Sequence, residues 1–398
     1  RAISALPHEQ SEPALEIAGR IRCRAALVLS SNLPAAQCAT LHTVAKRHGV
    51  QLLGPNSLGF QRPFLKLNAS VAGPLATPGP LALVSQSGAL TSSVLDWAQQ
   101  NGVGFSTVVS LGANTAVDLA QVLDFLAADG STHSILVYME GITNARRFMS
   151  ALRAAASIKP VVVMKAGRKP AGTSAALTHS AAIVGADDVF EAALRRAGVV
   201  RVRAFTQMFS AAKCLASRYR PVGERLAIVT NGGGPGVLAA DWTNEIGLEV
   251  ARLEGPTRNA LAPLLSPHAS LTQLIDLGEE ATAAHYRAAV EACGTDGGVD
   301  GILVIYSPKP AAYTGANPEE IAQAVIDGSA KLGKPIIACW MGDNSVSGAR
   351  KLLNAKPLPS VRTPEAAVDA FGNIASFYQN QQLLQQTPPP LSTLATPD

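Results

Sequence analysis

The sequence predicts an α/β protein built on parallel sheets, and three observations support that prediction. Short runs rich in Val, Ile and Leu alternate with helix-like segments along most of the chain. These runs are apolar throughout rather than at every second residue, which is typical of parallel strands covered by helices on both faces. A strand that leads through a glycine-bearing turn into a helix also occurs twice, as LALVSQSGALTSS at 81–93 and LAIVTNGGGPGVLAA at 226–240. We therefore expect an internal repeat of domain size.

The bulk composition indicates a folded protein with several domains. Its 398 residues are 47% apolar and 16% charged, which excludes a disordered chain and allows two or three cores. The formal net charge is +4, and the basic residues are scattered rather than clustered. This pattern argues against a nucleic-acid partner and against an anionic membrane surface.

The cysteines and the apolar runs indicate a protein of the cytoplasm. Five cysteines lie far apart without metal-site spacing, and we expect them to be reduced. No apolar run is long enough to span a bilayer, and the first residues lack the pattern of a secretory signal. We therefore expect a cytoplasmic protein with no metal site in this chain. The cysteines are Cys23, Cys38, Cys214, Cys293 and Cys339.

Residues 1–78 are expected to form part of a Rossmann-like domain. The segment 24–32 is strand-like, 35–49 is helix-like, and 50–60 is a strand that runs into a loop. A complete domain of this kind opens with a strand and a glycine-rich turn for phosphate, and the sequence shows no such opening. We therefore expect only the later half of the domain, in a chain that begins within it.

Two flavodoxin-like domains are expected to follow, at 79–205 and 206–380. In the first, strands are predicted at 81–88, 105–112, 133–141 and 159–167, with helices between them. In the second, strands are predicted at 225–230, 300–310 and 334–343, with a closing helix at 363–378. The tail, 381–398, is rich in Pro and Thr and is expected to be a linker.

Each turn of the repeat is a candidate phosphate site. Such a turn presents backbone N–H groups and the positive end of a helix at the carboxyl edge of the sheet. In the first turn the hydroxyls of Ser85 and Ser87 add donors, and in the second the glycines let the backbone approach an anion closely. Neither turn is a P-loop or a full dinucleotide fingerprint, so a tight turn without a ligand remains the alternative for each. The candidate phosphate-binding residues are Ser85, Gln86, Ser87, Gly88, Ala89, Gly232, Gly233, Gly234 and Gly236.

A lone histidine, His179, lies in a loop of small and hydroxyl residues at 169–188. Neutral imidazole is a nucleophile near pH 7, because its reference pKa is about 6.5. If one ring nitrogen attacks phosphorus, the other should donate to a carboxylate. Glu140 is the candidate, because it follows a buried strand at the edge where α/β sheets place functional groups. The alternatives are a surface histidine and a solvated glutamate that caps the next helix.

Six stretches together resemble one family. They are LLGPNSLGF, LALVSQSGAL, LVYMEGI, the block from KAGR through THSAAIVGADDVFEAALRRAGVVRV, TNGGGPGVLAADW and TPEAAVDAF. They are similar to the NDP-forming acyl-CoA synthetases, which include ADP-forming acetate–CoA ligase and the succinyl-CoA synthetase α chain. LDWAQQNGVGFS, NARRFMSALRAA and NQQLLQQTP look most like the large bacterial fusions of this family that add an ATP-grasp domain and an N-acetyltransferase domain.

The resemblance implies a reaction and a role for each candidate residue. Acyl-CoA, ADP and phosphate would be interconverted with acid, CoA and ATP, through an acyl phosphate and a phosphohistidine. It implies that His179 carries the phosphoryl group, that Glu140 supports it, and that 85–89 and 232–236 hold the phosphate. The segment Gly54, Pro55, Asn56 and Ser57 would lie beside the CoA thiol and the acyl group.

The resemblance also implies partners and leaves alternatives open. ADP or ATP with Mg²⁺ would bind on an ATP-grasp domain or β-type subunit that this chain lacks, and an oligomer is expected. Where the family tends to have Asn-Pro before IDL, this chain has Gln273 and Leu274, which puts a local loop in doubt. A CoA-sensing regulatory region of a protein lysine acetyltransferase, without ligase turnover, is the main alternative. A structural subunit with inactive sites is a third.

Overall fold

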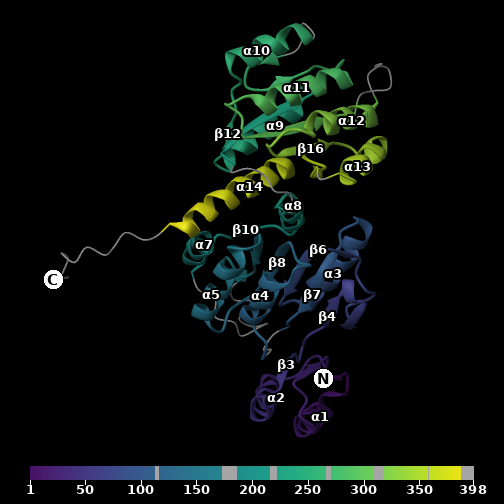
Figure 1. The fold of residues 1–398 in the computed structure, drawn as a ribbon, viewed down its shortest axis with the longest axis vertical. Coiled ribbons are helices and arrows are strands. Elements are labelled where there is room, and N and C mark those ends of the chain that lie inside the picture. The colour runs from purple at the N-terminus through teal and green to yellow at the C-terminus, as the bar shows by residue number, and fades with distance from the viewer. Residues whose placement is uncertain are drawn as a thin grey trace, which may run out of the picture. The chain divides into compact units, whose positions relative to one another are not determined.

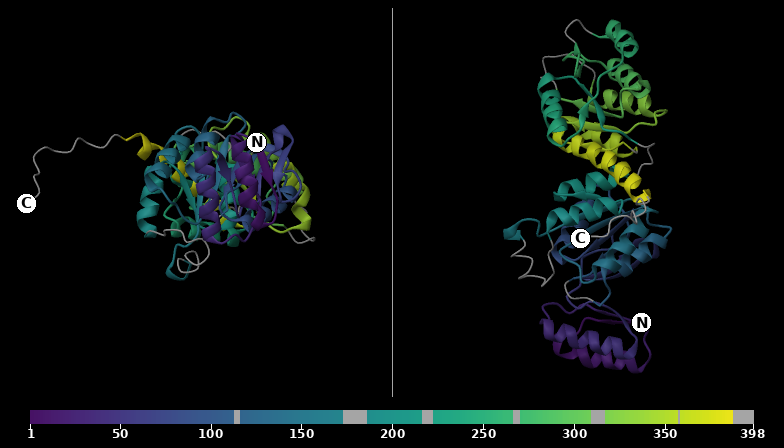
Figure 2. Two further views of the ribbon diagram at one scale, coloured as in Figure 1. Left: turned by 90° about the horizontal axis from the view of Figure 1, so that it is seen from below. Right: turned by 90° about the vertical axis from the view of Figure 1, so that its left-hand side faces the viewer.

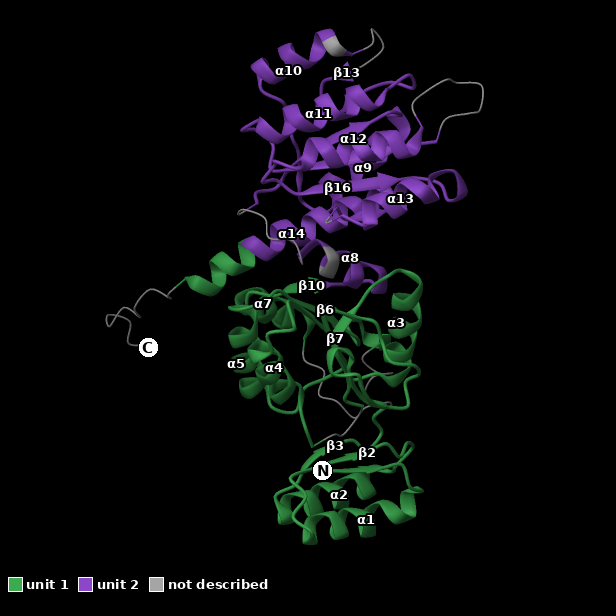
Figure 3. Cartoon of the chain, turned by 45° about the vertical axis from the view of Figure 1, so that its right-hand side comes forward, with its two compact units in different colours: residues 1–201, 379–398 green, residues 202–378 purple. Residues whose placement is uncertain are grey.

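The computed structural model describes residues 1–112, 116–172, 186–215, 222–265, 270–308, 317–356 and 358–386. The chain divides into two compact units, and each has its own hydrophobic core. Residues 1–201 and 379–398 form the first unit, and 202–378 form the second (Figure 3). None of the helices within the described ranges is both long and apolar enough to cross a membrane.

The first unit opens with a small parallel sheet, in the order β1-β2-β3. Its strands are β1 (Ala2–Ser4), β2 (Ala25–Val28) and β3 (Gln51–Leu53). Helices α1 (His8–Arg20) and α2 (Ala35–His48) pack together on one face of it (Figure 2). The first strand that we predicted, at 24–32, corresponds to β2, and β1 and α1 precede it without having been predicted. They were missed because β1 has three residues and α1 is polar and contains Pro13.

The second sheet of this unit has seven strands in the order β10-β9-β8-β6-β7-β4-β5. Strands β6 (Pro78–Ser85), β7 (Phe105–Ser110), β8 (Ser134–Met139) and β9 (Val161–Lys165) are parallel, and β10 (Val200–Val202) ends the sheet. At the other edge, β4 (Gly59–Arg62) pairs antiparallel with β7 and with β5 (Leu67–Ser70). The short helix η1 (Pro63–Leu65) connects β4 to β5. The helices are α3 (Gly88–Gln100), α4 (Leu119–Ala128), α5 (Ala145–Ala156) and α7 (Asp187–Arg196) (Figure 1).

This sheet changes the first expected domain boundary. We placed the boundary at residue 78, after the whole segment 59–70. In the structure that segment forms β4 and β5, and β4 pairs with β7 of the following sheet. A hairpin of mixed polarity gives no sign in sequence of which sheet it will extend, so the boundary was placed too late.

The second unit holds one sheet in the order β13-β14-β11-β15-β16-β17, and β12 also pairs with β11. The strands are β11 (Arg225–Thr230), β12 (Glu249–Val250), β13 (Ser270–Leu271), β14 (Ile275–Asp276), β15 (Gly301–Tyr306), β16 (Ile336–Trp340) and β17 (Ser360–Val361). The helices are α8 (Phe205–Leu215), α9 (Gly233–Glu245), α10 (Gly255–Leu261), α11 (Ala283–Thr295), α12 (Pro318–Ser329) and α13 (Ser347–Asn354), with short turns η2 (Ala262–Leu264) and η3 (Asn344–Val346). Tyr286 and Trp340 are fully buried in its core.

The closing helix is longer than the sequence predicts. We expected the helix at 363–378 and a linker from 381, whereas α14 (Pro364–Gln385) continues to Gln385. Near its end Asn380 donates to the Val199 carbonyl at 2.7 Å, and Gln381 donates to the Gly198 carbonyl at 2.8 Å. These bonds hold the last turns of the helix to the first unit. Residues 387–398 lie outside the described part of the chain.

The two large sheets share one strand order, which confirms the internal repeat. The order β7-β6-β8-β9-β10 in the first unit corresponds to β14-β11-β15-β16-β17 in the second. Both follow the flavodoxin-like arrangement, in which the first strand lies between the second and the third. In the registers Ser85 pairs with Ser110, and Thr230 pairs with Asp276. Each position in one unit can therefore be compared with its counterpart in the other.

Candidate active site

In the turn before α3, which is the first helix start of the repeat, serine hydroxyls form the hydrogen bonds that close the turn. The Ser85 hydroxyl donates to the Ser87 carbonyl at 2.8 Å and accepts from the Ser87 N–H at 3.1 Å. Ser87 is the N-cap of α3, and its hydroxyl oxygen accepts from the Leu90 N–H at 3.3 Å. The hydroxyls of Ser85 and Ser87 thus bond within the turn, and their predicted role as phosphate donors stays a prediction.

Two N–H groups in this turn remain directed away from the helix. Gly88 and Ala89 begin α3, where the first N–H groups have no partner within a helix. Neither group donates to any residue in the described part of the chain. A Cβ built on Gly88 would lie 3.1 Å from Leu58, so the glycine also allows close packing here. Of the five predicted residues in this turn, Gly88 and Ala89 best fit an anion.

The side chain of Gln86, which we predicted to bind phosphate, forms three hydrogen bonds within the protein. Its amide oxygen accepts from the N–H groups of Glu140 at 2.6 Å and Gly141 at 3.2 Å. Its amide nitrogen donates to the Gly141 carbonyl at 2.9 Å. The side chain therefore fastens the helix start to the end of β8 and is not aimed at a ligand.

Glu140 is a buried carboxylate at the carboxyl end of β8, and its predicted role beside His179 stays a prediction. It follows β8 directly, and only 8% of its surface is exposed. β8 lies next to β6, and the boundary between the first and third strands is the switch point where flavodoxin-like sheets bind ligands. The structure thus brings Glu140 and the start of α3 together at one edge of the sheet.

Tyr138 is a neighbour of Glu140 that sequence reasoning missed. Tyr138 lies near the end of β8, and Glu140 directly follows that strand. Burial raises the pKa of the Tyr138 hydroxyl to about 12, and the charge of Glu140 and a hydrogen bond to it add to this shift. The hydroxyl therefore keeps its proton at neutral pH and faces the carboxylate as a donor.

The second helix start repeats the first with glycine in place of serine. The Thr230 hydroxyl donates to the Gly232 carbonyl at 2.8 Å and accepts from the Gly232 N–H at 3.1 Å, as Ser85 does with Ser87. Gly236 donates to the Gly232 carbonyl within α9, so its N–H is engaged in the helix, and its predicted part in phosphate binding stays a prediction. Within the described residues, the N–H groups of Gly233 and Gly234 donate to none.

A carboxylate also lies at the second helix start. A Cβ built on Gly233 would be 3.4 Å from Oδ2 of Asp276. The other oxygen of Asp276 accepts from the Gly278 N–H at 3.0 Å. Sequence reasoning did not single out Asp276, although its place at the end of β14 is a signal of the same kind as that of Glu140.

The predicted CoA segment, Gly54 to Ser57, is tightly packed. Asn56 accepts from the Leu33 N–H at 2.9 Å through its side-chain oxygen, and the Ser57 hydroxyl donates to the Ser110 carbonyl. A Cβ on Gly54 would lie 2.1 Å from the Val28 carbonyl oxygen, so this position requires glycine. The side chains of Asn56 and Ser57 are therefore engaged with the protein itself. The predicted contact with CoA stays a prediction.

The predicted nucleophile, His179, lies outside the described residues. The elements before and after its loop are described, and they contain a buried cation that we did not predict. Lys165 ends β9 at 4% exposure, donates to the Ala166 carbonyl at 2.9 Å and lies over the ring of Phe190. Burial lowers the pKa of its ammonium, and nearby Asp187 partly opposes this. The sequence feature that could have identified Lys165 is its position at the end of the apolar run VVVMK.

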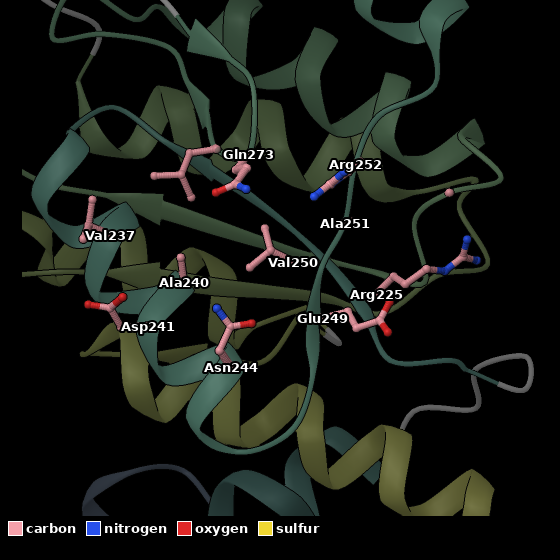
Figure 4. A pocket seen from close by; sticks show the side chains of 12 residues that line it. Arg225, Val237, Ala240, Asp241, Asn244, Glu249, Val250, Ala251, Arg252 and Gln273 are labelled. Atoms are coloured by element: carbon pink, nitrogen blue, oxygen red, sulfur yellow. The ribbon is translucent and has the colours of Figure 1, made fainter.

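A separate cavity of about 650 Å³ lies in the second unit, lined in part by residues of α9 and β12 (Figure 4). It is lined by charges of both signs, among them Arg225, Asp241, Glu249 and Arg252. Gln273, which departs from the expected Asn, also lines it. The lining includes none of the residues we predicted to hold phosphate, so the cavity is not the candidate site.

Comparison with known proteins agrees with this geometry. The family model described as "Succinyl-CoA ligase like flavodoxin domain" matches residues 78–215. The acetate–CoA ligase [ADP-forming] I of Archaeoglobus fulgidus is 34% identical over 382 residues, which cover 94% of this chain and 54% of that protein. The α subunit of acetate–CoA ligase [ADP-forming] I of Pyrococcus furiosus is 34% identical over 330 residues, which cover 82% of this chain and 70% of that subunit.

A solved structure extends the similarity to the whole fold. It is a dinucleotide-forming acetyl-coenzyme A synthetase 1 of Ca. Korarchaeum cryptofilum, in complex with phosphate and ADP, with a TM-score of 0.88 at 26% identity. The match covers 96% of this chain and 83% of that one. This chain spans about half the length of the Archaeoglobus protein. From the sequence, the switch-point geometry and these matches, the chain belongs to the family of ADP-forming acetate–CoA ligases, the NDP-forming acyl-CoA synthetases.

Proposed function

We propose that the chain is the α-type portion of an NDP-forming acyl-CoA synthetase. It interconverts acyl-CoA, ADP and phosphate with a carboxylic acid, CoA and ATP. The observation that carries the proposal is the buried carboxylate of Glu140 at the switch point, next to a helix start whose first N–H groups donate to no described residue. A carboxylate next to an anion site suits an imidazole that accepts a phosphoryl group.

The chemical steps follow from these groups. Phosphate attacks the carbonyl of acyl-CoA, the C–S bond breaks, and CoA leaves with an acyl phosphate formed. A ring nitrogen of His179 then attacks the phosphorus, the bond from phosphorus to the acyl oxygen breaks, and the carboxylic acid leaves. Glu140 accepts the other ring N–H and stabilises the cation that forms. The N–H groups of Gly88 and Ala89, and later those of Gly233 and Gly234, hold the phosphoryl oxygens.

The nucleotide step is assigned to a partner. ADP and ATP, with Mg²⁺, bind to an ATP-grasp domain or β-type subunit, where phosphohistidine passes its phosphoryl group to ADP. The support is that one relative is described as an α subunit and that another is about twice as long as this chain. The bacterial fusions that the sequence resembles carry that domain on the same polypeptide. Assembly into an oligomer and a place in the cytoplasm are part of the same proposal.

Chemical phosphorylation tests the proposal directly. The purified chain, incubated with acetyl phosphate, should form an acid-labile and base-stable phosphoprotein. His179→Ala should abolish the label, and Glu140→Gln should slow its formation about 100-fold or more, because the amide cannot balance the charge on the imidazole. His133→Ala is the matched control, since His133 is an exposed histidine at the opposite end of β8.

Two outcomes would contradict the proposal. Equal labelling of the wild type and His179→Ala would exclude His179 as the carrier. CoA binding in calorimetry without any labelling of the wild type, even with ATP and a β-type partner, would favour a regulatory region that senses CoA.

A further inference from the structure

The two parts of the candidate site follow different strands: the start of α3 follows β6, and Glu140 follows β8. Some interaction must therefore fix the position of Glu140 relative to the start of α3. Paired residues of β6 and β8 run as far as Ser85 and Tyr138, and the last bond between the strands joins the Gln86 N–H to the Tyr138 carbonyl at 3.1 Å. Beyond this pair the chain turns away from the sheet into α3. The N–H groups of Glu140 and Gly141 therefore have no strand partner on that side.

The Gln86 side chain replaces the missing strand partner. Its oxygen accepts from both N–H groups, at 2.6 and 3.2 Å, and its nitrogen donates to the Gly141 carbonyl at 2.9 Å. These three bonds continue the pairing of the two strands past the point where the β6 backbone leaves. They fix the position of Glu140 along the strand direction, relative to the N–H groups of Gly88 and Ala89.

The second unit contains the same arrangement at the matching position. Asn231 corresponds to Gln86 and Ser307 to Glu140. The Asn231 side chain accepts from the Ser307 N–H at 2.8 Å and donates to the Ser307 carbonyl at 3.0 Å. Asparagine is one methylene shorter, and it bonds both groups of residue 307 itself, whereas glutamine reaches one residue further. Both halves of the repeat therefore use an amide side chain to bond the backbone after the third strand, Gln86 in the first and Asn231 in the second. We call this arrangement the amide clamp.

We propose that Gln86 is a positioning residue that fixes Glu140 relative to the start of α3. The inference rests on the proposed function. Gln86 acts through the backbone of residues 140 and 141 and does not contact phosphate. Removing it would misplace the carboxylate at the moment the imidazole becomes charged, while the N–H groups that bind the phosphoryl oxygens stay in place. The cost should therefore appear in the rate of the chemical step and not in affinity for the phosphoryl donor.

The test compares the wild type with Gln86→Met, which has similar length and no hydrogen-bonding amide. Single-turnover labelling by acetyl phosphate is measured over a range of its concentrations. We expect the maximal rate to fall by about 10-fold to 100-fold, with the half-saturating concentration changed less than about twofold. In Gln86→Asn the maximal rate should also fall while the half-saturating concentration changes little. The fall should be smaller than in Gln86→Met, because the asparagine amide is too short only to reach Gly141.

Hydrogen exchange supplies a readout independent of activity. In Gln86→Met the amides of Glu140 and Gly141 lose their acceptor and should exchange faster, while those of 135–137 within β8 should not change. Ser106→Ala is the matched control. It removes a buried bond to the Leu81 carbonyl at the opposite edge of the same sheet, and should leave both the rate and the exchange at 140–141 unchanged.

The outcomes separate the inference from the proposed function. If the wild type forms no phosphohistidine, the proposed function fails, and exchange at 140–141 still tests the clamp. If the wild type is labelled and Gln86→Met reacts at the wild-type maximal rate, the positioning role is wrong. A rise in half-saturating concentration at an unchanged maximal rate would instead make Gln86 a phosphate contact and overturn the inference.

Discussion

Burial raises the pKa of Tyr138, whose hydroxyl is hydrogen-bonded to Glu140. Tyr138 lies near the end of β8, Glu140 directly follows that strand, and the tyrosine hydroxyl donates toward the carboxylate. A phenol that keeps its proton can act only as a donor toward an ionised carboxylate. In the proposed mechanism the carboxylate therefore accepts from Tyr138 as well as from an imidazole N–H.

The raised pKa of Tyr138 predicts a dependence of stability on pH. In the unfolded chain tyrosine ionises near pH 10, and in the folded protein the pKa of Tyr138 is about 12. The folded protein holds this proton more tightly, so the stabilisation is complete below about pH 10 and is lost as the pH rises through about 12. The difference in unfolding free energy between the wild type and Tyr138→Phe should therefore shrink between about pH 10 and about pH 12. Urea unfolding of both proteins measures it, and a constant difference over this range would contradict the assignment.

Single residues show where sequence reasoning reaches its limit. The position of Glu140 could be predicted, because a glutamate directly after a buried strand must lie at the carboxyl edge of the sheet. The role of Gln86 could not, because whether an amide meets a ligand or a neighbouring strand depends on which strand lies beside it. Lys165 was missed for a related reason: a lysine at a strand end is usually exposed, and its burial depends on Phe190 from α7.

The helices and strands with long apolar patterns were predicted well. β8, β9, β11, β15 and β16 all fall within predicted runs, because a strand buried on both faces must be apolar throughout, while β6 begins at Pro78, before the run predicted at 81–88. β1 and α1 were missed, since a three-residue edge strand and a helix with mostly polar residues give no such run. The strand order of the second unit also required the structure, because β13 and β14 have only two residues each.

The start of α9 allows one donor to be removed without disturbing the helix. Gly233 is the first helical residue, where proline is well tolerated, and the extended backbone of Gly232 suits a residue before proline. Gly233→Pro removes one N–H that would bind a phosphoryl oxygen. A hydrogen bond to a charged group contributes about 1.5–3 kcal/mol, so ATP formation by the complete protein should slow by about 10-fold to 100-fold.

Gly233→Ala is the matched control for this change. A Cβ at Gly233 meets its nearest neighbour, Oδ2 of Asp276, at 3.4 Å, which is an ordinary contact. The alanine keeps the N–H, so its activity should stay close to that of the wild type. Equal losses in the alanine and proline variants would mean that space, and not the N–H donor, limits the reaction here.

The two halves of the repeat have kept their framework and changed their chemistry. Both retain the closing hydroxyl, the amide clamp and two N–H donors at the helix start. At the end of the third strand the first half has Glu140 and the second has Ser307, and at the end of the fourth the first has Lys165 and the second Trp340. The sequence predicted the shared framework through its paired motifs. The divergence at the other strand ends required the aligned registers.

Separate cores predict that the two units lose stability independently. Ile135 on β8 and Ile302 on β15 occupy matching positions, and both are fully buried. Each belongs to its own hydrophobic cluster, and no described residue belongs to both clusters. Ile135→Ala should lower the unfolding free energy of the first unit by about 2–5 kcal/mol, and Ile302→Ala should do the same to the second.

Hydrogen exchange by mass spectrometry reports the two units in one experiment. Ile135→Ala should speed exchange of slowly exchanging amides in β6, β8 and β9, while those of β11, β15 and β16 keep their wild-type rates. Ile302→Ala should give the reverse pattern, so each variant serves as the control for the other. If either change sped exchange equally in both sheets, the units would unfold as one, and the framework shared by the repeat would have to be treated as a single cooperative structure.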